Sequence, residues 1–234
     1  MKKKYALTFD IDWAPDFAIL KCLDLVEQAN CKATFFATHD TPLNREIISR
    51  GHNLGIHPNF LPGSSQGSDV ISIIAECLNY APDAWCMRTH SLVQSSPLLF
   101  EIFSNFPQLK LDVSIFMHRS PFAHKVSWNF DGVSFDRLLY NWEDDAQFCY
   151  YSFEEQSELF FGDLTVFNFH PIHVFLNTSD GSEHLRLKKE ASDTPLSSFD
   201  VKTVNGYINS GRGTQSYLKE VLVSKNVCIE LGDI

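Results

Sequence analysis

The sequence lacks the marks of several protein classes. It has six cysteines in 234 residues but no CxxC pair and no dense cysteine framework, so we expect reduced, mostly buried thiols. No run approaches the ~18 consecutive apolar residues that a membrane-spanning helix requires. Three lysines follow Met1, as in a signal peptide, but Asp10 and Asp12 interrupt the apolar stretch behind them. We therefore expect a soluble protein of the cytoplasm.

The sequence also lacks an excess of positive charge. Nineteen lysines and arginines stand against 29 acidic residues, which gives a formal net charge of -10 and argues against a nucleic acid partner. A length of 234 residues with 44% apolar residues suffices for one large domain. Because no repeat or linker is present, we predict a single domain over 1–234 with a polar excursion at about 178–213. The sequence indicates no oligomeric state.

Short apolar runs alternate with helix-like segments along most of the chain. Seven runs have the character of strands: Tyr5 to Ile11, Ala33 to Ala37, Asn53 to Ile56, Ala84 to Met87, Leu111 to Phe116, Arg137 to Trp142 and Leu164 to Phe169. Five segments have helical spacing: Pro15 to Gln28, Asn44 to Arg50, Ser68 to Tyr80, Pro97 to Phe106 and Thr214 to Val223. This alternation predicts an α/β fold built around a parallel sheet or barrel.

Ionisable residues gather where the predicted strands end. Asp10 and Asp12 close the first strand, and their spacing of two directs both side chains to the same side. Arg88 and His90 share a face for the same reason. The carboxyl ends of parallel strands meet at one face of a barrel, so we predict the active site there.

Two pairs of histidines have an odd spacing. A continuous strand would send the two members of each pair to opposite sides, so at most one of each should face the pocket. The pairs are His52 with His57 and His170 with His173.

A divalent metal would explain the two neighbouring acids. Two carboxylates as close as Asp10 and Asp12 repel each other unless a cation or a shared proton lies between them. An acid together with imidazoles is an ordinary ligand set for zinc. One carboxylate would bind the ion, and the other would remain free as a base toward water. Arg88 would keep that base ionised, and His170 would supply the proton that a leaving amine needs.

Several stretches of the chain together resemble a known family. They read LTFDID at 7–12, ATFFAT at 33–38, RGHNLGIHPN at 50–59, CMRTH at 86–90, WEDD at 142–145 and FNFHPIH at 167–173. In this order they resemble the motifs of the metal-dependent polysaccharide deacetylases of carbohydrate esterase family 4, over roughly residues 5 to 175. The resemblance implies a distorted (β/α)7 barrel. The sequence is most similar to the cytoplasmic branch associated with bacterial surface-polysaccharide and lipopolysaccharide assembly.

The resemblance also assigns roles. It implies a catalytic base, an arginine that steadies the base, a general acid, and an acid that orients the general acid: Asp10, Arg88, His170 and either Asp144 or Asp145. It implies Asp12 and His57 as metal ligands, with zinc as the expected ion and cobalt or nickel as alternatives.

The chain departs from the family at one ligand. The family has a second metal histidine four residues after the first, where this chain has Leu61. Catalytic zinc normally takes three protein ligands, so we predict His90 as the third, with Gln66 as a weaker candidate. A degenerate site without metal is the alternative.

The resemblance implies an amino sugar or a glycan precursor as the substrate, from which an acetyl or formyl group is removed. The rings of Trp13 and Trp142 are the candidates for the floor of the sugar site. Two other functions stay open: hydrolysis of a non-sugar C–N bond on the same barrel, and sugar binding without catalysis. Structural roles also stay open, since Asp10 and Asp12 can cap a turn before Pro15.

Overall fold

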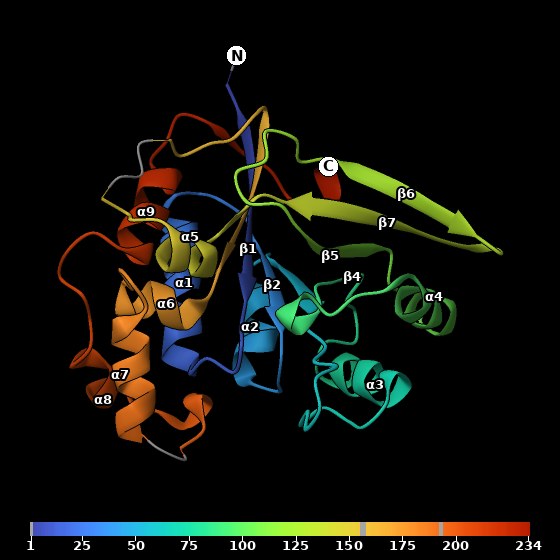
Figure 1. The fold of residues 1–234 in the computed structure, drawn as a ribbon, viewed down its shortest axis with the longest axis horizontal. Helices are drawn as coiled ribbons and strands as arrows, with labels where there is room; N and C mark the ends of the chain where they lie inside the picture. The colour runs from blue at the N-terminus through green and yellow to red at the C-terminus, as the bar shows by residue number, and fades with distance from the viewer. Residues whose placement is uncertain (1, 155–157, 192–193) are drawn as a thin grey trace.

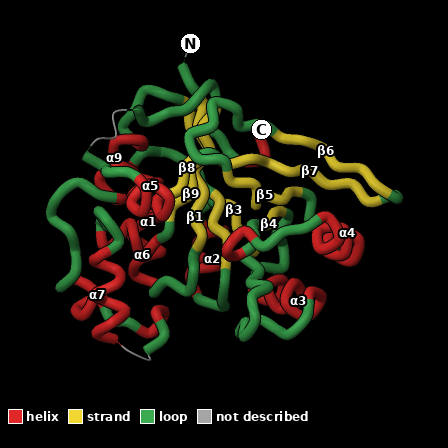
Figure 2. Tube along the Cα trace, in the orientation of Figure 1, coloured by secondary structure: helices red, strands yellow, loops and turns green. Residues whose placement is uncertain are grey.

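The computed structural model describes residues 2–154, 158–191 and 194–234, and strands of this part form one sheet. The sheet order is β6-β7-β5-β4-β3-β2-β1-β9-β8, with β10 paired to β1 (Figures 1 and 2). All pairs are parallel except β6 with β7. The strands are β1 (Lys4–Asp10), β2 (Thr34–Ala37), β3 (Asn53–Ile56), β4 (Cys86–Met87), β5 (Leu111–Phe116), β6 (Lys125–Phe130), β7 (Val133–Tyr140), β8 (Trp142–Glu143), β9 (Leu164–Phe169) and β10 (Val227–Cys228).

The sheet returns on itself through one bent segment. β7 pairs with β5, and after Asn141 the chain continues as β8, which pairs with β9. The buried Asn141 bridges the bend, because its backbone N–H donates to the carbonyl of Val166 over 3.2 Å and its side-chain oxygen accepts the Val166 N–H over 2.8 Å. Its side-chain amide donates to the carbonyls of Ser120 and Leu164. With β7 and β8 taken as one, strands β1, β2, β3, β4, β5, β7–β8 and β9 form the predicted distorted barrel.

Alternate residues of the strands pack on the two sides of the barrel wall. The interior is filled by apolar side chains from six strands, among them Ala6, Phe36, Cys86, Val113, Leu138 and Val166. The other face, which includes Leu7 and Phe9 of β1, packs against the helices. Because side chains alternate along β1, Asp10 has the same orientation as Ala6 and therefore faces the mouth of the barrel.

The helices surround the outside of the sheet (Figure 2). They are α1 (Asp16–Gln28), α2 (Pro42–Ser49), α3 (Val70–Tyr80), α4 (Ser96–Asn105), α5 (Asp144–Tyr150), α6 (Pro171–Leu176), α7 (Ser182–Ala191), α8 (Val201–Asn205) and α9 (Thr214–Leu222). Helix α1 packs against α2 and α6, α6 packs against α9, and α3 packs against α4. No helix in the described ranges is both long and apolar enough to cross a membrane.

The predicted elements match the observed ones unevenly. The predicted strands Asn53 to Ile56, Leu111 to Phe116 and Leu164 to Phe169 have the observed bounds, whereas the predicted strand Arg137 to Trp142 spans the bend between β7 and β8. Six elements were not predicted: β6, β10, α5, α6, α7 and α8. Helices α7 and α8 lie inside the polar excursion, which is therefore partly helical.

Candidate active site

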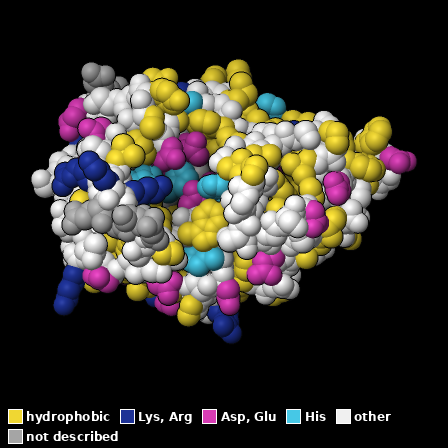
Figure 3. Space-filling model, turned by 60° about the horizontal axis from the view of Figure 1, so that its bottom comes forward, with side chains coloured by type: hydrophobic (Ala, Val, Ile, Leu, Met, Phe, Trp, Pro, Cys, Tyr) yellow, Lys and Arg dark blue, Asp and Glu magenta, His cyan; other side chains and the backbone are white. Residues whose placement is uncertain are grey.

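The predicted chemical groups converge at one mouth of the barrel. Each is at or just after the carboxyl end of a parallel strand, in the order β1, β3, β4, β8 and β9: Asp10, His57, Arg88, Asp144 and His170. Figure 3 shows histidine and acidic side chains together in a hollow of this face. The prediction that the carboxyl ends of the strands carry the site therefore agrees with the geometry.

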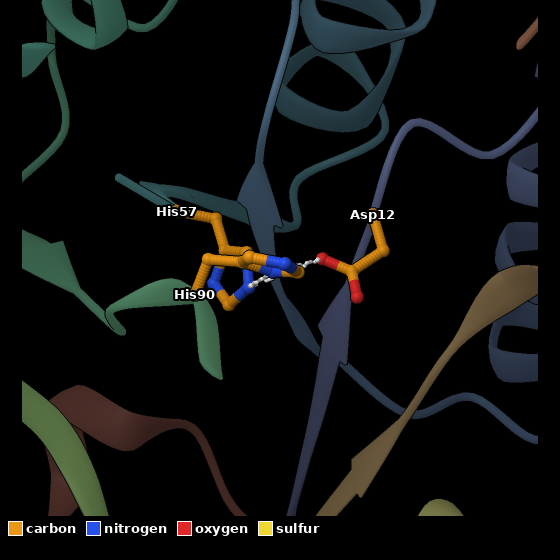
Figure 4. A group of neighbouring side chains, drawn as sticks. All are labelled: Asp12, His57 and His90. Atoms are coloured by element: carbon orange, nitrogen blue, oxygen red, sulfur yellow. Dashed lines mark hydrogen bonds and ion pairs between the residues drawn. The ribbon is translucent and has the colours of Figure 1, made fainter. Parts of the chain in front are cut away.

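Asp12, His57 and His90 form a compact triangle of ligand atoms (Figure 4). Oδ1 of Asp12 lies 3.1 Å from Nε2 of His57 and 3.1 Å from Nδ1 of His90, and the two nitrogens are 3.3 Å apart. A tetrahedral ion at ~2.0 to 2.2 Å from its ligands would separate them by roughly 3.3 to 3.6 Å. One carboxylate and two imidazoles at nearly this spacing fit zinc or a neighbouring divalent ion.

The charges of the triangle are mutually supporting. Burial alone would raise the pKa of Asp12, but hydrogen bonds from His57 and His90 outweigh burial and hold this pKa well below its usual range. Burial alone would lower the pKa of His90, but the hydrogen bond to Asp12 together with the negative charges of Asp12 and Asp10 outweighs burial and raises this pKa. The Asp12 carboxylate is therefore stabilised by a protonated imidazole beside it. A bound cation would stabilise the same carboxylate in place of that proton.

The backbone turns sharply to place Asp12. Strand β1 ends at Asp10, and Asp12 and Trp13 have φ values of 45° and 53°, in the left-handed region that residues with a Cβ seldom adopt. The Trp13 N–H donates to Oγ1 of Thr38 over 2.9 Å and so fixes this turn to the end of β2. The two acids then lie on either side of one imidazole, because Nδ1 of His57 is 3.8 Å from Oδ1 of Asp10.

His90 reaches the triangle because the chain stays extended beyond β4. The N–H groups of Arg88 and His90 donate to the carbonyls of Ile56 and Pro58 over 3.1 and 2.9 Å, at the two-residue spacing of a ladder. Arg88 and His90 therefore share a face as predicted, although β4 itself ends at Met87. A short 3-10 turn, His90–Leu92, then carries the chain away.

Neither Leu61 nor Gln66 joins the triangle. The Leu61 side chain is 40% exposed, which places it at the surface of its loop. Gln66 is buried, but its amide donates to the carbonyls of Thr38 and His57, and its oxygen accepts the Asn59 N–H over 2.6 Å. Gln66 thus holds the loop that carries His57. Of the two candidates for the third metal ligand, His90 and Gln66, only His90 lies next to Asp12 and His57.

Asp10 is held by two fixed donors. Its Oδ1 accepts from Nη1 of Arg88 over 2.9 Å, and its Oδ2 accepts from the side-chain amide of Asn168 over 2.8 Å. Arg88 is fully buried, and its guanidinium lies 4.1 Å from the ring centre of Tyr140. An ionised carboxylate in this position has its charge offset and a defined orientation, as a base toward water requires.

His170 is held by the acid that follows β8. Its backbone N–H and its Nδ1 both contact the carboxylate of Asp144, over 2.9 and 2.6 Å, whereas Asp145 lies 3.7 Å from Nδ1. Burial would lower the pKa of His170, but the charges of Asp145 and Asp144 outweigh it and raise this pKa well above its ordinary value. Of the two acids that the sequence left open, Asp144 makes the direct contact, and Nε2 of His170 lies 3.6 Å from Asp12.

The expectation that only one of His170 and His173 faces the pocket is wrong. The strand ends at Phe169 and the helix α6 begins at Pro171, so a spacing of three places both rings on one side. Nε2 of His173 lies 3.2 Å from Oδ1 of Asp145, and both histidines line the same cavity. For the other pair the expectation agrees with the geometry, because His52 instead accepts the Ala33 N–H.

A cavity of about 510 Å³ opens beside the triangle. Its walls include Asp12, Trp13 and His90 on one side and His184 and Lys188 of α7 on the other. Trp13 therefore lies at the wall of this cavity, and its contact with a sugar stays a prediction. The predicted substrate contact of Trp142 is wrong for this structure, because its ring is fully buried and stacks on Tyr217 with centroids 4.5 Å apart.

Two polar residues of the site were given no role in the sequence analysis. The amide of Asn168 donates both to Asp10 and to Oε1 of Glu143, and burial raises the pKa of Glu143 to about 7. The sequence could have predicted Asn168, because it is two residues before His170 and its side chain should therefore face the same side of the sheet. Glu143 has only its place next to Asp144, and the sequence does not show that β8 ends and α5 begins between them.

Comparisons with known proteins agree with this geometry. A family model described as WbmS-like polysaccharide deacetylase matches residues 7–188. A crystal structure from Bordetella bronchiseptica, described as a polysaccharide deacetylase involved in O-antigen biosynthesis, is similar over 94% of this chain and 89% of its own, with 33% identity and a TM-score of 0.77. No curated protein matches the chain.

Two more distant structures share the fold. A family 4 carbohydrate esterase from Streptomyces lividans has 14% identity and a TM-score of 0.52, over 97% of this chain and 91% of its own. The peptidoglycan deacetylase PdaC from Bacillus subtilis has 10% identity and a TM-score of 0.51, over 99% and 89%. The α/β barrel expected from the sequence is thus the architecture of carbohydrate esterase family 4 structures.

Proposed function

Because the chain belongs to the WbmS-like polysaccharide deacetylase family, we propose that it is a metal-dependent hydrolase that removes an acetyl or formyl group from the nitrogen of an amino sugar. One observation carries the proposal. Three ligand atoms within 3.3 Å of one another lie next to both an arginine-paired carboxylate and a carboxylate-paired imidazole. Hydrolysis of an amide requires a base toward water, stabilisation of an oxyanion and an acid toward the amine.

Asp12, His57 and His90 would hold the ion, with zinc as the expected metal. When bound, the ion would supply Lewis-acid polarisation of the acyl carbonyl and of the attacking water. The spacing of the three atoms and the chemistry of one carboxylate with two imidazoles support this assignment.

Asp10 would take the proton from water. Its two oxygens accept from Arg88 and Asn168, so its charge is offset and its orientation fixed before the substrate arrives. His170 would give a proton to the nitrogen as the C–N bond breaks, because an amine is a poor leaving group as an anion. Asp144 at Nδ1 leaves Nε2 of His170 as the nitrogen that faces the site.

The substrate would lie in the cavity between the triangle and α7, with Trp13 at its wall. The O-antigen description of the Bordetella bronchiseptica structure supports a role in bacterial surface-polysaccharide assembly. We therefore propose a glycan precursor, either a sugar nucleotide or a lipid-linked sugar, as the substrate and the cytoplasm as the location.

The deciding experiment measures bound metal and turnover in the same set of variants. We expect the protein to hold about one equivalent of zinc, cobalt or nickel by elemental analysis, and Asp12→Ala, His57→Ala and His90→Ala to lose most of it. Asp10→Asn should keep the metal but release acetate or formate at least ~100-fold more slowly from N-acylated hexosamines, tested free, as UDP conjugates and as oligosaccharides.

The matched control is His124→Ala, which removes an exposed histidine outside the site and should keep both metal and turnover. Wild-type protein without stoichiometric metal would contradict the proposal and favour a sugar-binding barrel. Turnover of non-sugar amides alone would favour another hydrolase on the same barrel.

A further inference from the structure

Glu143 lies at the centre of the site, yet none of the roles above uses it. Strand β8 pairs with β9 in the register that sets Glu143 opposite Asn168. A carboxyl oxygen of Glu143 lies within 4.8 Å of ligand atoms of both Asp10 and His170. Glu143 is half-buried, and withdrawing a carboxyl from water in this way is unfavourable unless its interactions offset the loss.

The carboxamide of Asn168 connects Glu143 to Asp10. Its two N–H groups serve two acids, Oδ2 of Asp10 over 2.8 Å and Oε1 of Glu143 over 3.1 Å. Its oxygen accepts from Nη1 of Arg88 over 2.5 Å and from Oγ1 of Thr8 over 3.2 Å. Because every donor and acceptor of this amide has a partner, a flipped amide would set its N–H groups against Arg88 and its oxygen against two acids.

Glu143 is itself fixed from behind. The hydroxyl of the fully buried Tyr140 donates to the same Oε1 over 3.1 Å. The ring of Tyr140 lies under the guanidinium of Arg88, which donates to Oδ1 of Asp10. Arg88, Asp10, Asn168, Glu143 and Tyr140 thus form a closed ring of contacts around the base, and such networks hold their members more firmly than isolated pairs do.

We propose that Glu143 is a positioning residue for the general base, and that it acts by holding the Asn168 carboxamide so that one N–H points at Oδ2 of Asp10. The inference rests on the proposed function in that it takes Asp10 as the base. Glu143 acts through Asn168, because the Asn168 amide is the group that donates both to Oε1 of Glu143 and to Oδ2 of Asp10. Both contacts of Glu143 use Oε1, which accepts hydrogen bonds whether or not the carboxyl carries a proton on its other oxygen.

The test compares three variants of the full chain. Glu143→Ala removes the acceptor and should lower kcat by about 10- to 100-fold with KM within about twofold, because the base is misplaced while the substrate site is intact. Glu143→Gln keeps an oxygen at the same place and should have a kcat at least about tenfold above that of Glu143→Ala. Glu101→Ala, an exposed acid on α4, is the matched control and should behave as wild type.

A crystal structure of Glu143→Ala gives a readout that does not depend on turnover. We expect the hydrogen bond between Asn168 and Oδ2 of Asp10 to be lost while the Asp12, His57 and His90 triangle stays in place. If Glu143→Ala does not fold, Tyr140→Phe replaces it, since this change removes the donor to Oε1 but keeps the ring under Arg88. Tyr140→Phe should lower kcat by about 3- to 10-fold, again with KM within about twofold.

Three results would overturn the inference. The first is an unchanged kcat in Glu143→Ala or in its replacement. The second is a Glu143→Gln variant as slow as Glu143→Ala, which would mean that the carboxyl acts through its proton or charge. The third is an Asn168 amide that stays bonded to Asp10 without Glu143. A wild-type protein without turnover would defeat the proposed function instead, and the crystal structure would still decide the position of Asp10.

Discussion

We expect Glu143 to make the stability of the protein depend on pH. Burial raises its pKa from 4.5 to about 7, so between these values the folded protein binds a proton that the unfolded chain has released. The contribution of this group to the free energy of unfolding therefore falls as pH rises from about 4.5 to 7, by on the order of 3 kcal/mol.

Glu143→Gln should remove the loss of unfolding free energy that the ionisation of Glu143 causes, because glutamine carries no charge at any of these pH values. We expect the variant to gain stability relative to wild type as the pH is raised from 5 to 8, measured by urea unfolding at each pH. Parallel curves for the two proteins across this range would show that the surroundings of Glu143 do not raise its pKa in the folded protein.

Single residues were predicted well where they follow a strand of known direction. Asp10 and His57 adjoin strands that the apolar runs define, and their side chains meet in the structure as the resemblance implied. His173 was misjudged because Pro171 starts a helix directly after β9, and a proline at the first helical position is a signal that parity reasoning ignores. The proposed role of Glu143 depends on its pairing with Asn168 of the neighbouring strand β9. The sequence alone does not give the register of the two strands, so it could not predict this pairing.

Among the elements, the bend between β7 and β8 depends on one side chain. Asn141→Ala would leave the Val166 N–H and the carbonyls of Ser120 and Leu164 without side-chain partners in the interior. We expect a loss of about 3 kcal/mol in the free energy of unfolding, measured by urea denaturation. Asn129→Ala, on the exposed strand β6, is the control and should stay within about 0.5 kcal/mol of wild type. A loss below about 1 kcal/mol in Asn141→Ala would show that the bend does not need this side chain.

The elements that the sequence missed have weak hydrophobic patterns. Strand β6 is almost entirely exposed, and it is joined to β7 by Asp131 and Gly132, which have φ values of 48° and 79°. An Asp-Gly pair between two runs is a hairpin signal that outweighs the polar composition around it. Helix α7 has few apolar residues, and its place is set by packing over the cavity rather than by its own sequence.

At the scale of the whole molecule, a bound ion would join three separate parts of the barrel mouth. Asp12, His57 and His90 follow β1, β3 and β4, so an ion that binds only the folded chain stabilises all three together. At a free concentration about 100 times its dissociation constant, it adds about 2.7 kcal/mol, which corresponds to roughly 5 to 10 °C in Tm.

Chelation should therefore lower the Tm of the wild type by this amount and leave Asp12→Ala unchanged, as measured by calorimetry. A wild-type Tm that does not respond to chelator would contradict a resident ion at the triangle.

Closure of the barrel by β7 and β8 has a kinetic consequence. The stretch that completes the circle also carries Tyr140, Glu143 and Asp144, whose hydrogen bonds connect to the groups that we propose as base and acid. A refolding chain in which β1 to β5 have already paired, but in which this seam is still open, lacks the contacts that these three residues make. We expect full activity to return only once this seam has closed, however early the rest of the barrel assembles.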